Sequence, residues 1–404
     1  MSKIEVRNVY KIFGPRPNRW LETVRGGMSK ETLLSKSGHT LGLRDINLSI
    51  EEGSIHVIMG LSGSGKSTLI RHFNRLIEPS AGKILVDGVD VTAMDARALE
   101  TFRRRKMSMV FQHFGLLPHR TVLENAAYGL AVQGVSRTEC ERRAQHWLEQ
   151  VGLSGFERQY PHHISGGMRQ RVGLARALAT DAEILLMDEA FSALDPLIRR
   201  EMQDQLLQLQ TQLNKTIVFI THDLDEALRL GNRIAILKDG ELVQEGTPED
   251  ILLRPSNDYV QAFLQDVNRT KALSATHVLN PPRLTLTMRS RPGRALEQMS
   301  VLGYQYAPVL DGKRLAGVLT VEAARQARKQ GLRDVSTMVD ELASVPATAG
   351  LDQVLAQLVH SNQPVAVTGE GHEFLGMLSR RKVADLVAPA SSPAVCEEQS
   401  SVSS

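Results

Sequence analysis

The sequence predicts an α/β fold, a sheet with helices on its faces, followed by a second and smaller α+β domain. Compact apolar runs at Ile55–Met59, Ile184–Met187 and Thr216–Ile220 have the length and composition of buried strands. Helical patterns alternate with them, as after Lys66, and such alternation is typical of a largely parallel sheet. A repeat near the C-terminus predicts the second domain.

Length and composition exclude several classes of protein. The 404 residues suffice for two or three domains, and contents of 42% hydrophobic and 23% charged residues are ordinary for a soluble protein. A net charge of +3 is too small to suggest a nucleic-acid partner, so we expect none. Two distant cysteines, Cys140 and Cys396, fit a reducing compartment. With no signal peptide in Met1–Tyr10 and no apolar run near the ~20 residues of a membrane helix, we expect any work at a membrane to depend on partners.

Further elements follow from local patterns. We expect strands at Met1–Phe13, Leu43–Ile50, Lys83–Val86 and Lys106–Phe111, and a helix at Val135–Gly152. Between the first two strands lies a stretch, Gly14–His39, rich in Pro, Arg, Lys and Ser, in which Lys30–Leu34 fits a short amphipathic helix.

The repeat consists of two copies about sixty residues apart. Ala307–Leu310 and Gly317–Thr320 in the first resemble Pro364–Val367 and Gly376–Ser379 in the second. Each copy has a strand, a polar turn, a second strand and then a helix, which predicts a paired small domain.

A glycine-rich loop carries the strongest chemical signal. Gly60–Ser67 matches G-x-x-x-x-G-K-[ST] and directly follows the strand Ile55–Met59, the context in which backbone N–H groups and a helix N-terminus surround phosphate. We expect Lys66 to pair with the β- and γ-phosphates and the Ser67 hydroxyl to bind Mg²⁺. The alternative is a flexible Gly/Ser loop. The expected nucleotide-binding residues here are Gly60, Ser62, Gly63, Ser64, Gly65, Lys66, Ser67 and Thr68.

Two consecutive carboxylates end the apolar strand Ile184–Met187. We expect Asp188 to hold the Mg²⁺ shell and Glu189 to accept a proton from the attacking water. The alternative is that two acids simply end a strand at the surface.

Four further motifs lie in order along the chain. Gln112 follows a strand, and Ser165-Gly166-Gly167-Met168-Arg169-Gln170 starts a helical pattern that runs to Leu178. Ser192-Ala193-Leu194-Asp195 comes soon after the two carboxylates, and His222 follows the strand Thr216–Ile220. By itself the second motif is an ordinary helix cap, and a lone histidine is usually structural.

In this order the motifs resemble those of ABC transporter ATPases over residues 1 to about 265. The resemblance implies a P-loop NTPase fold with a RecA-like core, an antiparallel β subdomain and a helical subdomain at about 116–164. It implies ATP and Mg²⁺ as cofactors, Gln112 as a metal and permease contact, and Asp195 as the D-loop acid. It implies His222 as the γ-phosphate contact, and Phe13 as the adenine-stacking aromatic, with Tyr10 as its rival. It also implies a head-to-tail homodimer, in which the signature residues Ser165, Gly166, Gly167 and Gln170 close over the nucleotide of the other copy.

Further detail resembles one subfamily, the ATP-binding subunits of glycine betaine/L-proline importers. The insertion at 15–39, the run Val57–Ser67 continued by Asn74–Pro79, and the run Leu185–Arg199 carry this resemblance. It implies an integral membrane permease, a substrate-binding protein, and a peripheral location at the cytoplasmic face of the bacterial plasma membrane. Another quaternary amine, such as choline or carnitine, is the alternative substrate. A soluble ABC ATPase acting on DNA or the ribosome is the alternative class, but 112–165 leaves no room for its usual coiled coil.

The C-terminal repeat resembles the tandem CBS domains of such subunits. We therefore expect an ATPase domain at 1–267, a tandem CBS regulatory domain at 268–387 and a disordered tail at 388–404. Nucleotide-binding CBS domains often place an Asp after Thr or Ser, but here Glu322 follows Thr320 and Arg381 follows Ser379, so we expect no adenosine there. The basic groups either face an anionic membrane surface, in a contact that salt would screen, or are solvated. These groups are Arg325, Arg328, Lys329, Arg380, Arg381 and Lys382.

Overall fold

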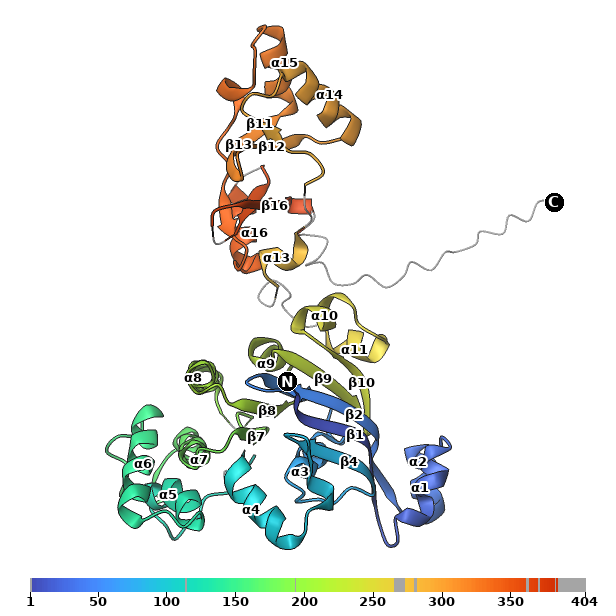
Figure 1. Ribbon diagram of the computed structural model, residues 1–404, viewed down its shortest axis with the longest axis vertical. Helices are drawn as coiled ribbons and strands as arrows, with labels where there is room; N and C mark the ends of the chain where they lie inside the picture. The colour runs from blue at the N-terminus through green and yellow to red at the C-terminus, as the bar shows by residue number, and fades with distance from the viewer. Residues whose placement is uncertain are drawn as a thin grey trace, which may run out of the picture. The chain divides into compact units, whose positions relative to one another are not determined.

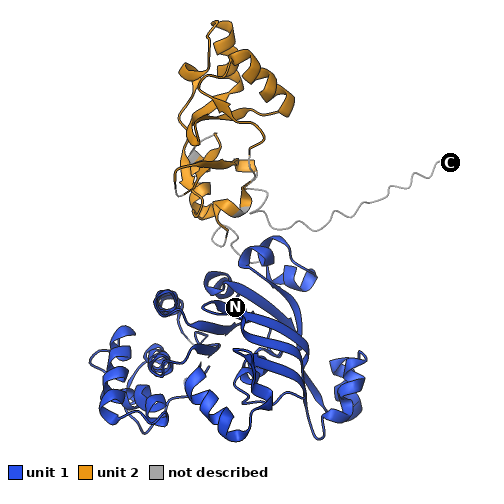
Figure 2. Cartoon of the chain, in the orientation of Figure 1, with its two compact units in different colours: residues 1–264 blue, residues 265–404 orange. Residues whose placement is uncertain are grey.

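The computed structural model describes residues 2–112, 115–192, 194–264, 273–279, 282–360, 363–369, 371–381 and 383. The chain divides into two compact units, Met1–Leu264 and Gln265–Ser404 (Figure 2). The boundary expected near Asn268 and the tail expected at 388–404 lie outside the described residues.

The first unit is built on a six-stranded sheet in the order β10-β9-β3-β8-β7-β6 (Figure 1). Only β10 is antiparallel to its neighbour, as the alternation of strands and helices predicts. Every residue of β3, β7 and β8 is buried, which explains why these strands are continuous apolar runs. Because β3, β7 and β8 run parallel to one another, their carboxyl ends meet at one edge of the sheet. The strands are β3 (Ile55–Met59), β6 (Met107–Val110), β7 (Ile184–Asp188), β8 (Thr216–Thr221), β9 (Arg233–Lys238) and β10 (Glu241–Gly246).

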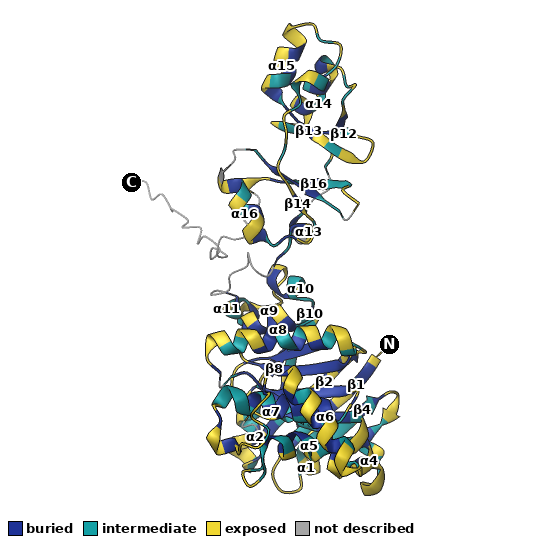
Figure 3. Cartoon of the chain, turned by 90° about the vertical axis from the view of Figure 1, so that its left-hand side faces the viewer, coloured by how far each residue is buried: buried dark blue, intermediate teal, exposed yellow. Residues whose placement is uncertain are grey.

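A second, antiparallel sheet covers part of the first, in the order β2-β1-β4-β5. Its alternating inward residues, such as Ile4 and Val6 of β1, share one core with Ile58 of β3 and with Phe73 of helix α3. Figure 3 shows these inner strands as buried, with exposed residues on the outer helices. The strands are β1 (Ser2–Phe13), β2 (Thr40–Glu51), β4 (Ala81–Val86) and β5 (Val89–Asp90), and α3 spans Lys66–Phe73.

The insertion between β1 and β2 forms two helices, α1 (Asn18–Arg25) and α2 (Lys30–Ser37). The short helix expected at Lys30–Leu34 is confirmed and is longer, since Gly38 at φ 68° ends it. Ser29 caps its start by accepting a hydrogen bond from the Thr32 N–H at 3.1 Å.

Three helices pack against one another at the side of the sheet: α5 (Val122–Val132), α6 (Arg137–Gln150) and α7 (Gly166–Ala179) (Figure 1). A capping box between Thr121 and Glu124 starts α5. The remaining helices are α4 (Ala96–Lys106), α8 (Pro196–Leu213), α9 (Leu224–Leu230), α10 (Pro248–Leu253) and α11 (Asp258–Phe263), with 3₁₀ turns at Val91–Ala93 and Pro161–His163. The strand expected from Lys106 begins one residue later, because Lys106 is the last residue of α4.

The second unit repeats one small motif, which confirms the internal repeat. In each copy a short strand pairs in parallel with a second strand, which pairs antiparallel with a third. The first sheet has β11 (Leu286–Thr287), β12 (Tyr306–Asp311) and β13 (Arg314–Thr320), and the second has β14 (Ser344–Pro346), β15 (Val365–Thr368) and β16 (Phe374–Leu378). The helices are α13 (Ala275–Val278), α14 (Pro292–Leu302), α15 (Val321–Lys329) and α16 (Leu351–His360), with a 3₁₀ turn at Ser336–Met338.

Across the described residues of both units, no helix combines the length and the apolar character that crossing a membrane requires.

Candidate nucleotide-binding and catalytic site

The glycine-rich loop joins β3 to α3. Gly60 has φ 151°, and a Cβ there would lie 2.2 Å from the Leu237 carbonyl oxygen of β9, so only glycine fits. Gly65, with φ 104°, precedes α3, and no side chain caps this helix start. The loop therefore leaves backbone N–H groups available at its helix N-terminus.

Lys66 lies across this loop. Its ammonium donates to the carbonyl oxygens of Gly60 at 2.8 Å and Leu61 at 3.1 Å, and the side chain is 4% exposed. Burial lowers the pKa of Lys66, and the nearby charges of Glu189 and Asp188 act in the opposite direction.

The other predicted loop residues differ in exposure. Ser62 and Gly63 are exposed, whereas Ser64 is buried and its carbonyl accepts from the Gly240 N–H at 3.0 Å. Thr68 lies in the first turn of α3, and its carbonyl oxygen is 2.6 Å from His72 Nδ1.

Asp188 and Ser67 meet as the sequence predicts. The Ser67 hydroxyl donates to Asp188 Oδ1 at 2.8 Å, and Arg71 binds Oδ2 at 3.2 Å. Asp188 is 1% exposed, so these hydrogen bonds are made by a buried carboxylate. Arg71 was not predicted from the sequence, although its place one helical turn after Ser67 is a usable signal.

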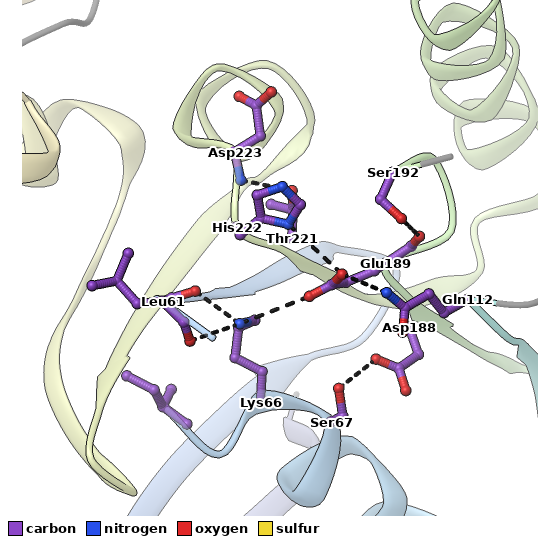
Figure 4. A network of polar contacts seen from close by, with 12 residues as sticks. Leu61, Lys66, Ser67, Gln112, Asp188, Glu189, Ser192, Thr221, His222 and Asp223 are labelled. Atoms are coloured by element: carbon purple, nitrogen blue, oxygen red, sulfur yellow. Dashed lines mark hydrogen bonds and ion pairs between the residues drawn. The ribbon is translucent and has the colours of Figure 1, made fainter. Parts of the chain in front are cut away.

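Glu189 lies at the centre of the expected catalytic residues (Figure 4). Its Oε2 accepts from Gln112 Nε2 at 2.9 Å and lies 3.7 Å from His222 Nδ1, while its Oε1 is 3.9 Å from the Lys66 ammonium. These residues come from α3, from the ends of β7 and β8, and from the segment after β6. The edge of the sheet thus brings together residues more than a hundred positions apart.

The backbone at Glu189 is unusual. It has φ 46°, a left-handed conformation that costs a residue with a side chain about 1–2 kcal/mol. In a regular strand Asp188 and Glu189 would point to opposite faces, but here both carboxylates reach the start of α3. The Glu189 N–H donates to the Ile220 carbonyl at 3.2 Å, and Ser192 donates to the Glu189 carbonyl at 2.9 Å, which hold this turn.

A buried network that sequence analysis missed lies behind His222. Thr221 Oγ1 donates to Glu226 Oε2 at 2.5 Å, and Gln203 of α8 donates to Oε1 at 3.1 Å. Burial raises the pKa of Glu226, and the Thr221 hydrogen bond acts in the opposite direction. Because the Asp223 N–H also donates to Thr221 Oγ1 at 3.0 Å, the network holds the turn that carries His222.

The two aromatic candidates differ in position. Tyr10 is 8% exposed and packs with Val24 and Leu33 of the insertion, whereas Phe13 is 37% exposed. A Cβ on Gly42 would lie 2.6 Å from the Phe13 ring, and a Cβ on Gly65 would lie 2.7 Å from the Gly42 carbonyl oxygen. The backbone of Gly42 thus lies between the Phe13 ring and Gly65 of the glycine-rich loop.

The signature residues are not part of this cluster. Ser165 caps α7 by accepting from the Met168 N–H at 3.3 Å, and no hydrogen bond among the described residues joins it to 60–68. Ser165, Gly166 and Gly167 line a hollow of about 450 Å³ together with Asp195, which caps α8. The other lining residues are Met168, Arg171, Leu194, Ile198 and three residues of 152–156. Gln170 is 1% exposed, so its side chain lies within the packing of this chain.

Two buried histidines flank the glycine-rich loop and make the stability of the fold around it sensitive to acid. His56 of β3 and His72 of α3 are each 0% exposed, and neither ring nitrogen of His56 has a hydrogen-bond partner among the described residues. Burial lowers the pKa of His56 to about 3 and that of His72 to about 4. A neutral histidine in the folded state contributes stability that is present above its unfolded pKa of 6.5 and is lost as pH falls below it.

We therefore expect the free energy of unfolding to fall between pH 6.5 and 5, by up to about 1.4 kcal/mol per pH unit for each histidine. The measurement is urea unfolding of the chain across this pH range. His56→Leu should flatten the dependence, whereas His146→Leu, at an exposed position of α6, should not. Equal slopes in the native chain and the His56→Leu variant would contradict the assignment.

Comparisons with known proteins agree with this geometry. Residues 43–192 match the ABC transporter family, and residues 332–389 match the CBS domain family. The chain is 46% identical over 384 residues to the glycine betaine/proline betaine transport system ATP-binding protein ProV of Salmonella typhimurium, covering 94% of this chain and 96% of that protein. It is 48% identical over 379 residues to the glycine betaine transport ATP-binding protein OpuAA of Bacillus subtilis, covering 94% and 90%. A dimeric structure of MJ0796, a bacterial ABC transporter cassette, superposes with a TM-score of 0.53 at 34% identity, over 61% of this chain and 98% of that one.

The family and domain matches, the near-complete coverage of these relatives, and the cluster of Lys66, Asp188 and Glu189 lead to one assignment. The chain belongs to the ATP-hydrolysing subunits of ABC transporters, in the branch that contains the glycine betaine transport proteins.

Proposed function

We propose that this chain hydrolyses ATP to energise the uptake of glycine betaine or proline-type osmoprotectants through a separate permease. The observation that carries the proposal is the Glu189 carboxylate, held between Gln112, His222 and Lys66. The near full-length relatives, which are named as glycine betaine transport proteins, support the substrate.

The residues around Glu189 divide the work of phosphoryl transfer. Lys66 and the N–H groups of the glycine-rich loop bind and orient the β- and γ-phosphates, which accounts for most of the catalysis in such reactions. Glu189 accepts a proton from the attacking water, and Gln112 orients its carboxylate through the 2.9 Å hydrogen bond. His222 contacts the γ-phosphate from the turn after β8.

The chemistry of the donors fits Mg²⁺. The Ser67 hydroxyl, the Asp188 carboxylate and the Gln112 side-chain carbonyl are the hard oxygen ligands that this ion prefers. When bound, Mg²⁺ neutralises charge on the phosphate oxygens. Arg71, at 3.2 Å from Asp188, holds the second oxygen of this carboxylate in place.

Phe13 is the proposed adenine-stacking residue. Phe13 is 37% exposed and its ring packs over Gly42, with the Lys11 ammonium 5.0 Å from the ring centroid, whereas Tyr10 is 8% exposed.

A second copy of the chain completes the site. The residues that would close over the nucleotide of the other copy are Ser165, Gly166 and Gly167, with Asp195 beside them in the same hollow. The dimeric arrangement of the related bacterial cassette supports this proposal. Gln170 would act behind them, since its buried side chain lies one turn inside α7.

The remaining partners are an integral membrane permease, a substrate-binding protein and the anionic surface of the membrane, at the cytoplasmic face of a bacterial plasma membrane. Arg325, Arg328 and Lys329 are exposed on α15, and Arg380 and Arg381 are exposed after β16. Lys382 lies outside the described side chains.

The test of the substrate is uptake of labelled glycine betaine by cells that lack their own betaine importers and carry this chain with its neighbouring permease and binding protein. Uptake should rise with osmolarity and should be lost in a Glu189→Gln variant. Intact ATP hydrolysis without betaine uptake would overturn the substrate and leave the ATPase assignment in place. Choline and carnitine are then the next substrates to test, because relatives from Bacillus subtilis and Listeria monocytogenes carry these names.

The insertion supplies one further contact to the glycine-rich loop. Lys30, the first residue of α2, donates to the Gly63 carbonyl at 3.4 Å and lies 3.6 Å from Asp239 in the β9–β10 turn. Lys30→Gln should loosen the loop and raise the KM for ATP about two- to fivefold with little change in kcat, as expected for a weak charged contact. Lys36→Gln, in the last turn of the same helix, is the matched control, and an equal effect of both variants would contradict a specific role of Lys30.

A further inference from the structure

A cluster of arginines lines a hollow in the first copy of the C-terminal repeat. The hollow has a volume of about 560 Å³ and lies where the start of α14 meets the end of α15, two helices that pack side by side (Figure 1). Its eight lining residues are Arg291, Pro292, Gly293, Arg294, Arg328, Gly331, Leu332 and Arg333. Four of the eight lining residues are therefore arginines, and all four are exposed.

These four charges are not neutralised within the described part of the chain. None of the four arginines forms an ion pair or hydrogen bond with a described carboxylate. The adjacent Asp334 is occupied elsewhere, because it accepts from the Ser336 hydroxyl at 2.6 Å and from the Ser336 N–H at 3.1 Å. Like charges gathered without counter-charges repel one another, and a bound anion removes that repulsion.

The backbone adds to this positive field. Helix α14 has 11 residues, and its N-cap residue, Arg291, makes no side-chain cap to the first N–H groups. Pro292 has no N–H, so Gly293 and Arg294 supply the free ones at the positive end of the helix. A Cβ on Gly293 or Gly331 would meet nothing within 4 Å, so both glycines leave the hollow open to a ligand.

We propose that this hollow binds an anion that carries two or more phosphate groups. The planar fork of each guanidinium matches phosphate oxygens in a bidentate fashion, and the free N–H groups of a helix start bind the same atoms. Two phosphates bring about three to four negative charges, which matches four arginines. The volume lies within the range of ~300–1,000 Å³ for small-molecule sites.

This inference does not depend on transport, since it concerns the C-terminal unit alone. Two phosphate groups on one molecule occur in a free anion, such as pyrophosphate, and in a lipid headgroup, such as cardiolipin, whose two phosphodiesters carry one negative charge each. The two sources are tested separately.

The test of a free anion is isothermal titration of the full chain with inorganic pyrophosphate, in a Lys66→Ala background that weakens phosphate binding at the glycine-rich loop. The test variant is Arg294→Gln/Arg333→Gln, which removes two charges from the hollow. The control is Lys313→Gln/Arg314→Gln, which removes two charges from exposed positions where β12 turns into β13, outside the hollow. The Kd should rise at least about tenfold in the test variant and less than about twofold in the control. Circular dichroism should be native for both, because all four positions are exposed.

The test of a lipid headgroup is co-sedimentation of the same proteins with phosphatidylcholine vesicles, with and without cardiolipin. If the test variant loses pyrophosphate binding but keeps cardiolipin binding, the hollow is assigned to a free anion. If it loses cardiolipin binding but keeps pyrophosphate binding, the hollow is assigned to a headgroup. If neither probe binds the parent chain, or if the test and control variants lose binding equally, the proposal is overturned.

Discussion

Replacement of Glu189 by Gln should lower the rate of ATP hydrolysis by about 10²–10⁴-fold, the usual contribution of a positioned general base. Gln has nearly the same shape, and its carbonyl oxygen can still accept the hydrogen bond that Gln112 donates at 2.9 Å. It cannot take up a proton, so the attacking water stays unactivated. Affinity for ATP should remain near that of the native chain, because Lys66 and the glycine-rich loop are unchanged.

The measurement combines phosphate release, equilibrium ATP binding and gel filtration in the presence of ATP, in which the variant should elute as a stable dimer. Glu149→Gln, at an exposed position near the end of α6, is the control and should behave as the native chain. Turnover of Glu189→Gln within about tenfold of native would remove this residue from the role of base.

Replacement of Asp188 by Asn should have the second-largest effect, a loss of about 10²-fold or more in Mg²⁺-dependent hydrolysis. The substitution keeps the size of a side chain that is 1% exposed but removes the negative charge that we propose binds the ion. The Mg²⁺ concentration for half-maximal activity should rise, while binding of ATP without Mg²⁺ should change little.

A double-substitution cycle separates this role from a structural one. Ser67 donates to Asp188 at 2.8 Å, so both residues act on the same proposed ion. Ser67→Ala/Asp188→Asn should therefore lose much less activity than the product of the two single losses. Multiplicative losses, or an unaltered Mg²⁺ dependence in Asp188→Asn, would contradict a shared metal site.

Local sequence patterns were sufficient to predict the elements that carry the chemistry. The strand Ile55–Met59 has the bounds of β3, and the ordered motifs, by their resemblance to ABC ATPases, implied that Lys66, Asp188 and Glu189 serve one site. In the structure the carboxyl ends of the parallel strands bring these residues together. The repeat of strand, turn and strand in the C-terminal unit was visible because each copy is a short local pattern, and the two copies, about sixty residues apart, share it.

The contacts that support the site were not predictable in this way. Gln203 and Glu226 meet across 23 positions, and Lys30 reaches Gly63 across 33, so nothing in either local pattern indicates the partner. Helix α1 was missed because its apolar residues pack on Tyr10 in a small separate cluster that only the folded insertion creates. The exposure of Phe13 relative to Tyr10 likewise depends on how α1 and α2 fold back over β1 and β2.

The left-handed backbone at Glu189 has a consequence for the evolution of this protein. A conformation that costs about 1–2 kcal/mol is retained where it turns two neighbouring carboxylates toward one helix start, so selection for turnover and selection for thermal stability oppose each other at this codon. Laboratory evolution for heat resistance alone should accumulate glycine or asparagine at position 189, which relieve the backbone. Only a screen that also demands hydrolysis should keep glutamate.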